Sequence, residues 1–334
     1  MCTAHKKGVP MLNEIKYVYA VYQERSFTKA AKKLFISQPA LSNMVKKAEQ
    51  EIGCPIFDRS TVPLTLTKEG NFYIRSISQI LRLEKNLQDY YDDMKNLNTG
   101  TLSVGGSSFF CSFVFPHLIG EFRTKYPNIS INLQEGNVEE LRNALENERL
   151  DLIMETSIKE DDPKLDIFLF KTETIVLALP RAHPLNQHLT KYQWHSTFDQ
   201  DVPSSANVPP VPLIEFKDIP FILLKDGNDL GNRGISMCNE VGFSPKVAML
   251  TDQILTAANI AANGSDAVFL RADLFRYYPI QDKFCIYTLN SELARRKVYL
   301  AAKKGRYITN AMKTFLRLAC TEDLSNTSKS PLLL

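Results

Sequence analysis

Hydrophobic residues recur with two different periods along the chain. Before residue 98 they fall every three or four positions, which predicts helices, whereas beyond Gly100 short apolar runs and alternating stretches predict strands separated by helices. The first region is expected to hold three helices, a two-stranded turn and one long helix, over residues 12–24, 26–34, 37–52, 54–66 and 67–98. The change of period near Gly100 marks a domain boundary.

The second and third of these helices form a closely spaced pair joined by a short turn. Ser26 and Ser37 are expected N-caps, because a serine hydroxyl accepts hydrogen bonds from the free N–H groups of a first helical turn. Pro39 falls in a first turn, where its missing N–H costs nothing, and Gly53 suits the residue that ends a helix. The pair is therefore expected to be a helix-turn-helix.

The third helix has an apolar side and a polar side. The apolar residues, at helical spacing, are Leu41, Val45, Ala48 and Ile52. The polar side carries amides, a hydroxyl and lysines, namely Gln38, Ser42, Asn43, Lys46 and Lys47. Amides and hydroxyls can pair with base edges and lysines with phosphate, so this side suits a recognition helix in the major groove of double-stranded DNA. A solvated helix face is the alternative.

Charge and composition support a soluble module with an anionic partner. Residues 1–66 contain ten Lys/Arg and five Asp/Glu, a net charge of +5, which leaves −2 for the rest of a chain whose total is +3. No apolar run reaches the length of a membrane span and no signal peptide is evident, so we expect a cytoplasmic protein without membrane contact. The six cysteines have no metal-binding spacing and are expected to be reduced; Cys54 and Cys111 are either oxidant sensors or inert thiols.

The long helix carries an apolar stripe that is longer than one small core requires. Its residues are spaced by three or four positions: Tyr73, Ile77, Ile80, Leu83, Leu87, Tyr90 and Met94. About 30 residues would give a rod of roughly 45 Å. The pattern is typical of a coiled-coil seam and predicts a dimer, which would offer two recognition helices to a pseudo-palindromic site. Packing of the stripe on its own domain is the alternative.

The region beyond Gly100 is expected to be an α/β domain. Strands at 101–105, 129–133 and 150–155 alternate with helices at 113–126 and 138–148, which predicts a parallel sheet with right-handed crossovers. Further strands are expected at 168–170, 174–179, 221–224, 246–250, 267–270, 285–288 and 297–302, with helices at 231–241, 252–262 and 307–320. Residues 1–10, 197–212 and 323–334 are expected to be an arm, a polar loop and a tail.

Polar residues gather where the predicted strands end, and ligands bind at the carboxyl ends of such strands. The candidates for effector binding are Ser107, Ser108, Glu135, Thr156, Lys225, Arg233 and Asn263. Ser107 and Ser108 open a helix and could hold an anion, although plain N-capping is the alternative. With Lys225 and Arg233 as cations, the expected ligand is a small organic anion; those two could equally belong to a surface loop. We expect no cofactor and no metal.

Enzymatic chemistry is not expected. The five histidines have no triad spacing with cysteine or aspartate, and the chain has no P-loop, no G-x-G-x-x-G and no H-E-x-x-H. The leading hypothesis is a DNA-binding regulator controlled by a ligand. The alternative is a solute-binding or transferase-like α/β protein whose N-terminal helices mediate protein contacts only.

The helix-turn-helix region resembles the DNA-binding domain of LysR-type transcriptional regulators. The resemblance rests on Ser26-Phe27-Thr28, Ala30-Ala31, Leu34, Ser37–Ser42, Glu49, Gly53, Phe57, Arg59, Leu66-Thr67 and Glu69-Gly70. The later region resembles the family's effector-binding domain, which is similar to periplasmic solute-binding proteins, through Gly100-Thr101-Leu102, Ser107-Ser108, Pro116, Phe122, Tyr126-Pro127, Glu135-Gly136, Leu150-Asp151-Leu152 and His183-Pro184-Leu185.

The resemblance implies an architecture, a set of DNA-binding residues and partners. The architecture is a winged helix-turn-helix at 11–66, a linker helix at 67–98 and a two-lobed α/β domain at 100–322, with lobe I at 100–170 and 278–322, lobe II at 171–277, and crossovers near 165–172 and 271–280. The DNA-binding residues would be Ser26, Thr28, Ser37, Gln38, Pro39, Ser42, Asn43, Lys46, Lys47 and Arg59. Family members usually form tetramers, in which the effector changes how DNA is bent or RNA polymerase is engaged. The chain departs from the family at Val62-Pro63, where the wing usually carries basic residues.

Overall fold

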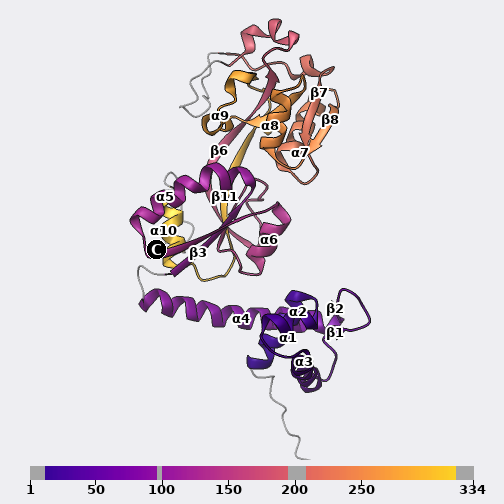
Figure 1. Cartoon of the computed structure of the whole chain (residues 1–334), viewed down its shortest axis with the longest axis vertical. Coiled ribbons are helices and arrows are strands. Elements are labelled where there is room, and N and C mark those ends of the chain that lie inside the picture. Colours follow the sequence, from indigo (N-terminus) through magenta and orange to yellow (C-terminus); the bar gives the residue numbers. More distant parts are fainter. Residues whose placement is uncertain (1–11, 96–99, 195–207, 321–334) are drawn as a thin grey trace, which may run out of the picture. The chain divides into compact units, whose positions relative to one another are not determined.

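The computed structural model describes residues 12–95, 100–194 and 208–320, and it divides into two compact units that meet in sequence between Lys95 and Asn96 (Figure 1). The expected arm at 1–10, the tail at 323–334 and residues 197–207 of the expected loop lie outside the described residues.

Unit 1 consists of helices around a small core, with a short β-hairpin. Its elements are α1 (Leu12–Glu24), α2 (Phe27–Lys33), α3 (Gln38–Ile52), β1 (Phe57–Asp58), β2 (Thr65–Leu66) and α4 (Lys68–Lys95). Val18, Leu41, Val45 and Ile56 are fully buried in its core. The strands β1 and β2 pair antiparallel and form, with the loop between them, the wing. The structure confirms the expected helices and the expected wing.

The helix ends of unit 1 use the residues that the sequence pattern indicates. The hydroxyl of Ser37 accepts a hydrogen bond from the N–H of Ala40 at 3.3 Å, and that of Ser26 accepts one from Lys29 at 3.3 Å. Gly53 ends α3 with φ of +81°, a conformation that other residues rarely adopt. A Cβ at Gly70 would lie 1.9 Å from the carbonyl oxygen of Ile56, so the first turn of α4 needs glycine to pack on the wing.

Unit 2 is an α/β domain of two lobes joined by two long strands. Lobe I contains β3 (Gly100–Gly106), a π-helical turn (Phe110–Val114), α5 (Phe115–Lys125), β4 (Ile129–Glu135), α6 (Val138–Glu146), β5 (Leu152–Glu155) and α10 (Asn310–Ala319). Lobe II contains β7 (Pro220–Leu224), α7 (Asp229–Glu240), β8 (Lys246–Thr251), α8 (Ile254–Ala262), β9 (Ala267–Arg271), α9 (Leu274–Tyr277) and β10 (Phe284–Tyr287). The long strands are β6 (Leu165–Pro180) and β11 (Arg295–Lys303).

Short 3-10 turns complete unit 2, at Pro184–Gln187, Thr190–Tyr192, Leu213–Phe216, Gln281–Lys283 and Glu292–Ala294. The strand order is β4-β3-β5-β11-β6-β9-β7-β8, and β10 pairs with β6. Strand β3 pairs parallel with β4 and β5, and β7 pairs parallel with β8 and β9, as expected for repeated crossover connections. The structure confirms the α/β class.

Strand β6 passes from one lobe into the other. It pairs with β11 over residues 165–174 and with β9 and β10 over residues 175–180. For this reason the two short strands expected at 168–170 and 174–179 are one strand of 16 residues.

The second crossover, at which the chain passes from lobe II back to lobe I, lies later in the chain than the expected region of 271–280. The chain returns through β11, whereas β9 and β10 both pair with the lobe II part of β6. The buried residues Leu274 and Phe275 of α9 keep the chain on lobe II between these strands. Lobe II therefore continues past residue 277 to the start of β11.

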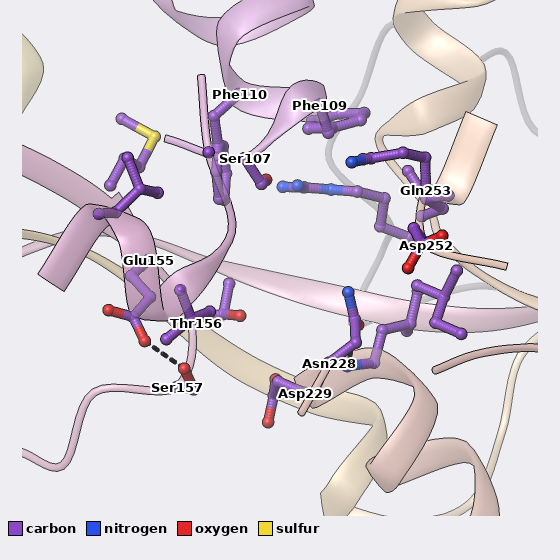
Figure 2. Close-up of a pocket in the computed structure, with 18 of the residues that line it drawn as sticks. Ser107, Phe109, Phe110, Glu155, Thr156, Ser157, Asn228, Asp229, Asp252 and Gln253 are labelled. Carbon is purple, nitrogen blue, oxygen red and sulfur yellow. Dashed lines mark hydrogen bonds between the residues drawn. The ribbon is translucent and has the colours of Figure 1, made fainter. Parts of the chain in front are cut away.

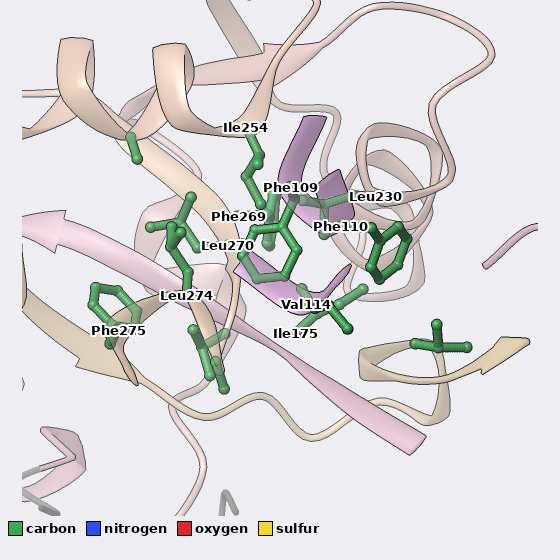
Figure 3. Close-up of a cluster of buried hydrophobic side chains, with 14 of the residues drawn as sticks. Phe109, Phe110, Val114, Ile175, Leu230, Ile254, Phe269, Leu270, Leu274 and Phe275 are labelled. Carbon is green, nitrogen blue, oxygen red and sulfur yellow. The ribbon is translucent and has the colours of Figure 1, made fainter. Parts of the chain in front are cut away.

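The two lobes share one hydrophobic core. Phe109 and Phe110, which precede α5 in lobe I, belong to the same buried cluster as Leu230 and Ile254 of lobe II (Figure 3). The helical conformation here begins at Ser108, earlier than the expected start at residue 113, and it passes through a π-helical turn at Phe110–Val114. No helix in the described part of either unit has the length and apolar character needed to cross a membrane.

Candidate functional site

Helix α3 buries one face and exposes the other. Leu41, Val45 and Ala48 are fully buried against unit 1, as the spacing predicts. The side chains of the opposite face are solvent-accessible: Gln38, Pro39, Asn43, Lys46 and Lys47 are exposed, and Ser42 is partly exposed. On α2, Thr28 is exposed as well. The face expected to read DNA is therefore accessible, whereas the hydroxyls of Ser26 and Ser37 cap helices.

Lys46 and Lys47 differ in their partners. The ammonium group of Lys47 forms an ion pair with Glu14 and lies 3.8 Å from Glu51. The hydrogen bond to Glu14 raises the pKa of Lys47. Lys46 forms no ion pair with any residue that the structure describes. Of these two lysines, Lys46 is the one whose charge is uncompensated within unit 1.

Arg59 and Glu49 join the wing to α3. A guanidinium nitrogen of Arg59 lies 3.0 Å from Glu49 Oε2, and the guanidinium also lies over the ring of Phe27, 5.2 Å from its centroid. The other oxygen of Glu49 accepts hydrogen bonds from the backbone N–H groups of Ile56 and Phe57, at 2.9 and 3.3 Å. Arg59 thus holds the base of the wing in position, and its side chain remains partly exposed.

The apolar stripe of α4 divides into a buried part and an exposed part. Ile77 is 2% exposed and lies in the core of unit 1, and Tyr73 packs against that core. Further along, Leu83 and Leu87 are 60% and 59% exposed. Ile80 and Tyr90 of the stripe are exposed too, as are Phe72 and Tyr91 beside it. The side chain of Met94 lies outside the described residues. A row of large apolar side chains this exposed marks an interaction surface.

A cavity of about 90 Å³ lies between the lobes of unit 2. Ser107, which follows β3, and Thr156, which follows β5, lie on one side of it (Figure 2). Asn228, Asp252 and Gln253 of lobe II lie on the other side. This is the position at which the strand order predicts a ligand site, beyond the carboxyl ends of parallel strands.

Of the seven candidate effector residues, the structure brings Ser107 and Thr156 to the cavity. The others lie outside its lining: Ser108, Glu135, Lys225, Arg233 and Asn263. Lys225 is exposed and its ammonium lies 2.8 Å from Asp252. Arg233 is held by Asp229 at 3.0 Å and donates to the carbonyl oxygen of Leu293 at 3.1 Å. The expected cations therefore point to other partners.

Two arginines that the sequence analysis did not single out line the cavity instead. Arg271 ends β9 and is 2% exposed, and Arg296 lies near the start of β11 and is 7% exposed. A signal for Arg271 was present, because it directly follows the apolar run at 267–270 and so falls at the carboxyl end of a buried strand. Arg296, at the start of an antiparallel strand, offered no such signal.

These arginines belong to a buried network of charges. Glu173 of β6 accepts hydrogen bonds from both Arg271 and Arg296. Arg296 also donates to Asp229 at 2.8 Å, and Arg271 to Asp273 at 2.7 Å. Burial acts to lower the pKa of Arg296, but Glu173 and Asp229 outweigh burial and raise it. The whole network consists of Lys171, Arg233, Arg271 and Arg296 with Glu173, Asp229 and Asp273.

The network carries one positive charge in excess, because four cations face three carboxylates. One guanidinium nitrogen of each arginine, Nη1 of Arg271 and Nη2 of Arg296, has no hydrogen-bond partner among the described residues. The guanidinium of Arg271 also stacks on aromatic rings, 3.6 Å from the centroid of Phe109 and 4.7 Å from that of Phe110. Of the network, Arg271, Arg296 and Asp229 line the cavity, together with Glu155 and Asp252. The cavity thus offers two free guanidinium donors and an aromatic wall.

The cysteines of unit 2 do not form a reactive centre. Burial, and secondarily the charge of Glu135, raises the pKa of Cys111 to about 11, and its thiol donates to the carbonyl oxygen of Gly106 at 3.3 Å. A thiol with such a pKa stays protonated at neutral pH and is a poor nucleophile. No cysteine in the described part of the chain forms a disulfide, and no group of His, Cys, Asp or Glu there could hold a metal ion.

A winged helix-turn-helix unit followed by a two-lobed α/β domain with a cavity between its lobes defines a class of ligand-responsive transcriptional regulators. The family described as "Bacterial regulatory helix-turn-helix protein, lysR family" matches residues 12–71, and "LysR substrate binding domain" matches residues 95–322. The chain therefore belongs to the LysR family of transcriptional regulators. It is a DNA-binding regulator with an effector-binding domain.

Individual relatives agree with this assignment. An uncharacterized HTH-type transcriptional regulator of Bacillus subtilis, YcgK, is 29% identical over 317 residues, which cover 91% of this chain and 92% of that protein. Full-length OxyR C199D from Pseudomonas aeruginosa has the same fold, with a TM-score of 0.67 at 21% identity, over 94% of this chain and 95% of that one. The structure of full-length CbnR in complex with its target DNA has a TM-score of 0.56 at 16% identity, and the match covers 93% of this chain and 99% of that chain. None of these supports the alternative of a solute-binding or transferase-like protein.

Proposed function

We propose that this regulator acts as a dimer whose two α3 helices read a pseudo-palindromic DNA site, and that a small organic anion bound between the lobes of unit 2 controls it. The observation that carries the proposal is the outer face of α3. This face combines exposed amides with an uncompensated lysine, directly opposite a fully buried apolar face.

The proposed roles on DNA follow from side-chain chemistry. The amides of Gln38 and Asn43 can pair with adenine edges, and the hydroxyl of Ser42 with several base edges. Lys46 binds phosphate, which requires no defined base. Four further residues flank this face, namely Thr28, Pro39, Lys47 and Arg59. Because Lys47 and Arg59 each have a carboxylate partner, they contribute less to phosphate binding than Lys46 does.

The proposed dimer forms through the exposed part of the α4 stripe. Ile80, Leu83, Leu87 and Tyr90 are solvent-accessible in the single chain, and burying them against a second copy would remove a large apolar surface from water. Two-fold pairing also supplies the second recognition helix that a pseudo-palindromic site needs. Assembly of dimers into tetramers, contact with RNA polymerase and a cytoplasmic location are part of the same proposal.

The proposed effector is an anion, bound by Arg271 and Arg296 in place of the lysine and arginine first expected. The free guanidinium donors of Arg271 and Arg296 favour a carboxylate, and Ser107 and Thr156 add hydroxyl groups from lobe I. The cavity volume is about 90 Å³. The effector is therefore small.

The proposed control works through the two long strands. A ligand that binds one arrangement of the lobes more tightly than another shifts the population toward that arrangement. Because β6 and β11 run through both lobes, such a shift alters unit 2 as a whole. The chain thereby changes transcription without catalysing a reaction.

A salt titration of DNA binding tests the proposal. If lysines such as Lys46 neutralise phosphates, the logarithm of the association constant falls linearly with the logarithm of salt concentration, by about 0.9 for each phosphate contacted. A folded dimer that retains no DNA at low salt would contradict the proposal. Binding that does not respond to salt would contradict it equally.

A further inference from the structure

The two arginines of the cavity offer their free donors close to each other. Arg271 donates to one oxygen of Glu173, and Arg296 donates to the other. Because both guanidinium groups contact the same carboxylate, they are close neighbours, and Nη1 of Arg271 and Nη2 of Arg296 are left without partners among the described residues. One carboxylate of a ligand can therefore accept a hydrogen bond from each arginine.

Two further carboxylates line the cavity, and each has a cation of its own. Glu155 accepts hydrogen bonds from Arg142 at 3.0 and 3.1 Å, and its carboxylate points toward Ser157 (Figure 2). Asp252 lies 2.8 Å from the ammonium of Lys225, and its side chain is 69% exposed, which places it at the mouth of the cavity. A second carboxylate on the ligand would meet these like charges, and a ligand ammonium would have to compete with Arg142 or Lys225.

Apolar side chains of lobe I form a part of the lining that is closed to water. Phe109, Phe110, Leu141 and Met154 line the cavity, and each is at most 3% exposed. Gly106 of β3 lies between two of them, because a Cβ there would be 3.1 Å from Phe110 Cβ and 3.7 Å from the carbonyl oxygen of Met154. Phe110 and Met154 are therefore neighbours in the wall of the cavity.

This apolar wall continues up to the arginines. The guanidinium carbon of Arg271 lies 4.7 Å from the centroid of the Phe110 ring, and Phe110 in turn lies next to Met154 across Gly106. A ligand whose carboxylate is held by Arg271 thus has aromatic and thioether surface beside the rest of its length.

We propose that the effector is a monocarboxylate with a short apolar chain. Its carboxylate bridges Arg271 and Arg296, its chain lies along Phe110, and Met154 sets the length of chain that the cavity accepts. This inference rests on the proposed function, because it requires an anion between the lobes, and it adds the chemical class of that anion. Methionine suits such a position, since its unbranched side chain presents an adaptable apolar surface.

The proposal predicts how affinity depends on the structure of the ligand. Each methylene that reaches the apolar wall leaves water, so binding should tighten about fourfold for each added carbon. The gain should end and reverse when the chain reaches Met154, because overfilling a packed site forces side chains out of place. A second charged group should weaken binding, since it would meet either a like charge or a carboxylate that is already paired.

Calorimetry on the full-length chain with straight-chain acids from acetate to heptanoate tests the class of ligand. Succinate and α-aminobutyrate are the matched comparison, because they share the carbon chain of butanoate but carry a second carboxylate or an ammonium group. Butanoate should bind at least about tenfold more tightly than either. Tighter binding of succinate or α-aminobutyrate, or an affinity that does not depend on chain length, would overturn the proposal.

Replacing Met154 tests the residue that sets the length. Met154→Val shortens the side chain and suits a strand, so the acid that binds best should become about one carbon longer. Met154→Ala should lengthen it by about two carbons, and the valine variant alone decides the point if the alanine variant does not fold. Met237→Val, at a buried methionine of α7 outside the cavity lining, is the matched control and should keep the wild-type order of affinities.

The possible results separate this inference from the proposed function. If no carboxylate binds the wild-type chain, the proposed anionic effector is itself contradicted. If the acids bind but Met154→Val keeps the wild-type order of affinities, Met154 does not set the length and the proposal fails. A change in that order that is equally large in Met237→Val would overturn the role of Met154 as well, because the effect would not come from the cavity wall.

Discussion

Single residues of α3 and the wing have separable roles, because the structure gives them different partners. Lys46 has an uncompensated charge, Lys47 shares its charge with Glu14, and Arg59 is held by Glu49. Gln38 has no charge but offers two donors and an acceptor at the start of the helix. A phosphate contact and a base contact should therefore come from different side chains.

Replacing Gln38 and Lys46 in turn tests this separation. Gln38→Ala should reduce discrimination between bases by about 1–3 kcal/mol while leaving binding to unrelated DNA unchanged. Lys46→Ala should weaken binding to all sequences alike and reduce the salt slope by about 1. Fluorescence anisotropy with specific and unrelated duplexes measures both effects. Lys246→Ala, at an exposed lysine of lobe II, is the matched control, and identical behaviour of the two α3 variants would contradict the roles assigned.

The sequence predicted that these α3 residues share one accessible face, because they lie on a single helix and their spacing alone determines the face on which each side chain lies. It did not predict Arg271 and Arg296 as cavity residues, because their positions depend on Glu173 and Asp229, which are distant in the chain. Pairing of β6 with β9 and β11 brings Glu173 to the two arginines, and the start of helix α7 brings Asp229 to Arg296. No local pattern records these contacts. Lys225 and Arg233 satisfied the local pattern, but their carboxylate partners direct them elsewhere.

The buried network should make unit 2 sensitive to acid. Burial acts to raise the pKa of Asp273, but Arg271 and Lys171 outweigh burial and lower it below the usual value of 3.8. The ionised carboxylate of Asp273 therefore stabilises the folded state. This contribution to stability is fully present above pH 3.8 and is lost as the pH falls through the lowered pKa. Asp273→Asn should therefore destabilise unit 2 at pH 7, by about 3 kcal/mol for the loss of one member of a buried pair.

Urea unfolding of wild type and Asp273→Asn between pH 7 and pH 3 measures this effect. The difference between the two proteins should shrink as the pH falls, because wild-type Asp273 becomes protonated. Exposed Asp218→Asn, on a surface ion pair with Lys246, is the control and should change stability little at any pH. A difference between wild type and Asp273→Asn that does not change with pH would contradict the account.

At the scale of elements, α4 and β6 each serve two parts of the structure. The first half of α4 completes the core of unit 1 through Ile74 and Ile77, and its second half exposes Leu83 and Leu87. The apolar spacing predicted one continuous stripe, since periodicity identifies the apolar face of a helix but not its partner. Similarly, β6 crosses both lobes, and periodicity divided it into two strands because its middle residues, Lys171, Thr172 and Glu173, are polar.

A charge on the exposed half of α4 should separate the dimer. Leu83→Glu or Leu87→Glu would bury a carboxylate in an apolar interface, so the dimer constant should weaken by at least about 100-fold. Sedimentation velocity over a range of concentrations measures the change, and the isolated chain should remain folded because both leucines are exposed. Ile214→Glu, at an exposed isoleucine of lobe II, should leave the dimer intact. A dimer unaffected by both leucine variants would place the interface elsewhere.

At the scale of the whole molecule, ligand binding in unit 2 must alter what unit 1 does on DNA. If the effector changes the affinity of the protein for DNA by some factor, DNA must change the affinity of the protein for the effector by the same factor. The cavity between the lobes is the place where such a ligand would contact both lobes at once. The ligand that we propose is an anion, because Arg271 and Arg296 each keep a guanidinium nitrogen without a hydrogen-bond partner among the described residues.

Calorimetry with small carboxylates tests this part of the account. Once a carboxylate that binds wild type is found, Ser107→Ala should weaken it by about tenfold, as expected for the loss of one hydrogen bond to a charged ligand. Ser108→Ala, at a serine outside the cavity lining, is the matched control and should bind like wild type. Unchanged binding in Ser107→Ala would contradict the assignment of the site.

The most direct measurement is selection of genomic DNA fragments by the purified full-length chain, followed by footprinting of the enriched fragments. A two-fold dimer should protect a site with dyad symmetry, whose half-sites are separated by one helical turn of DNA or a multiple of it, because its two α3 helices enter successive major grooves. A folded dimer that enriches no fragment at low salt would contradict the central claim. A footprint without dyad symmetry would contradict the proposed two-fold dimer.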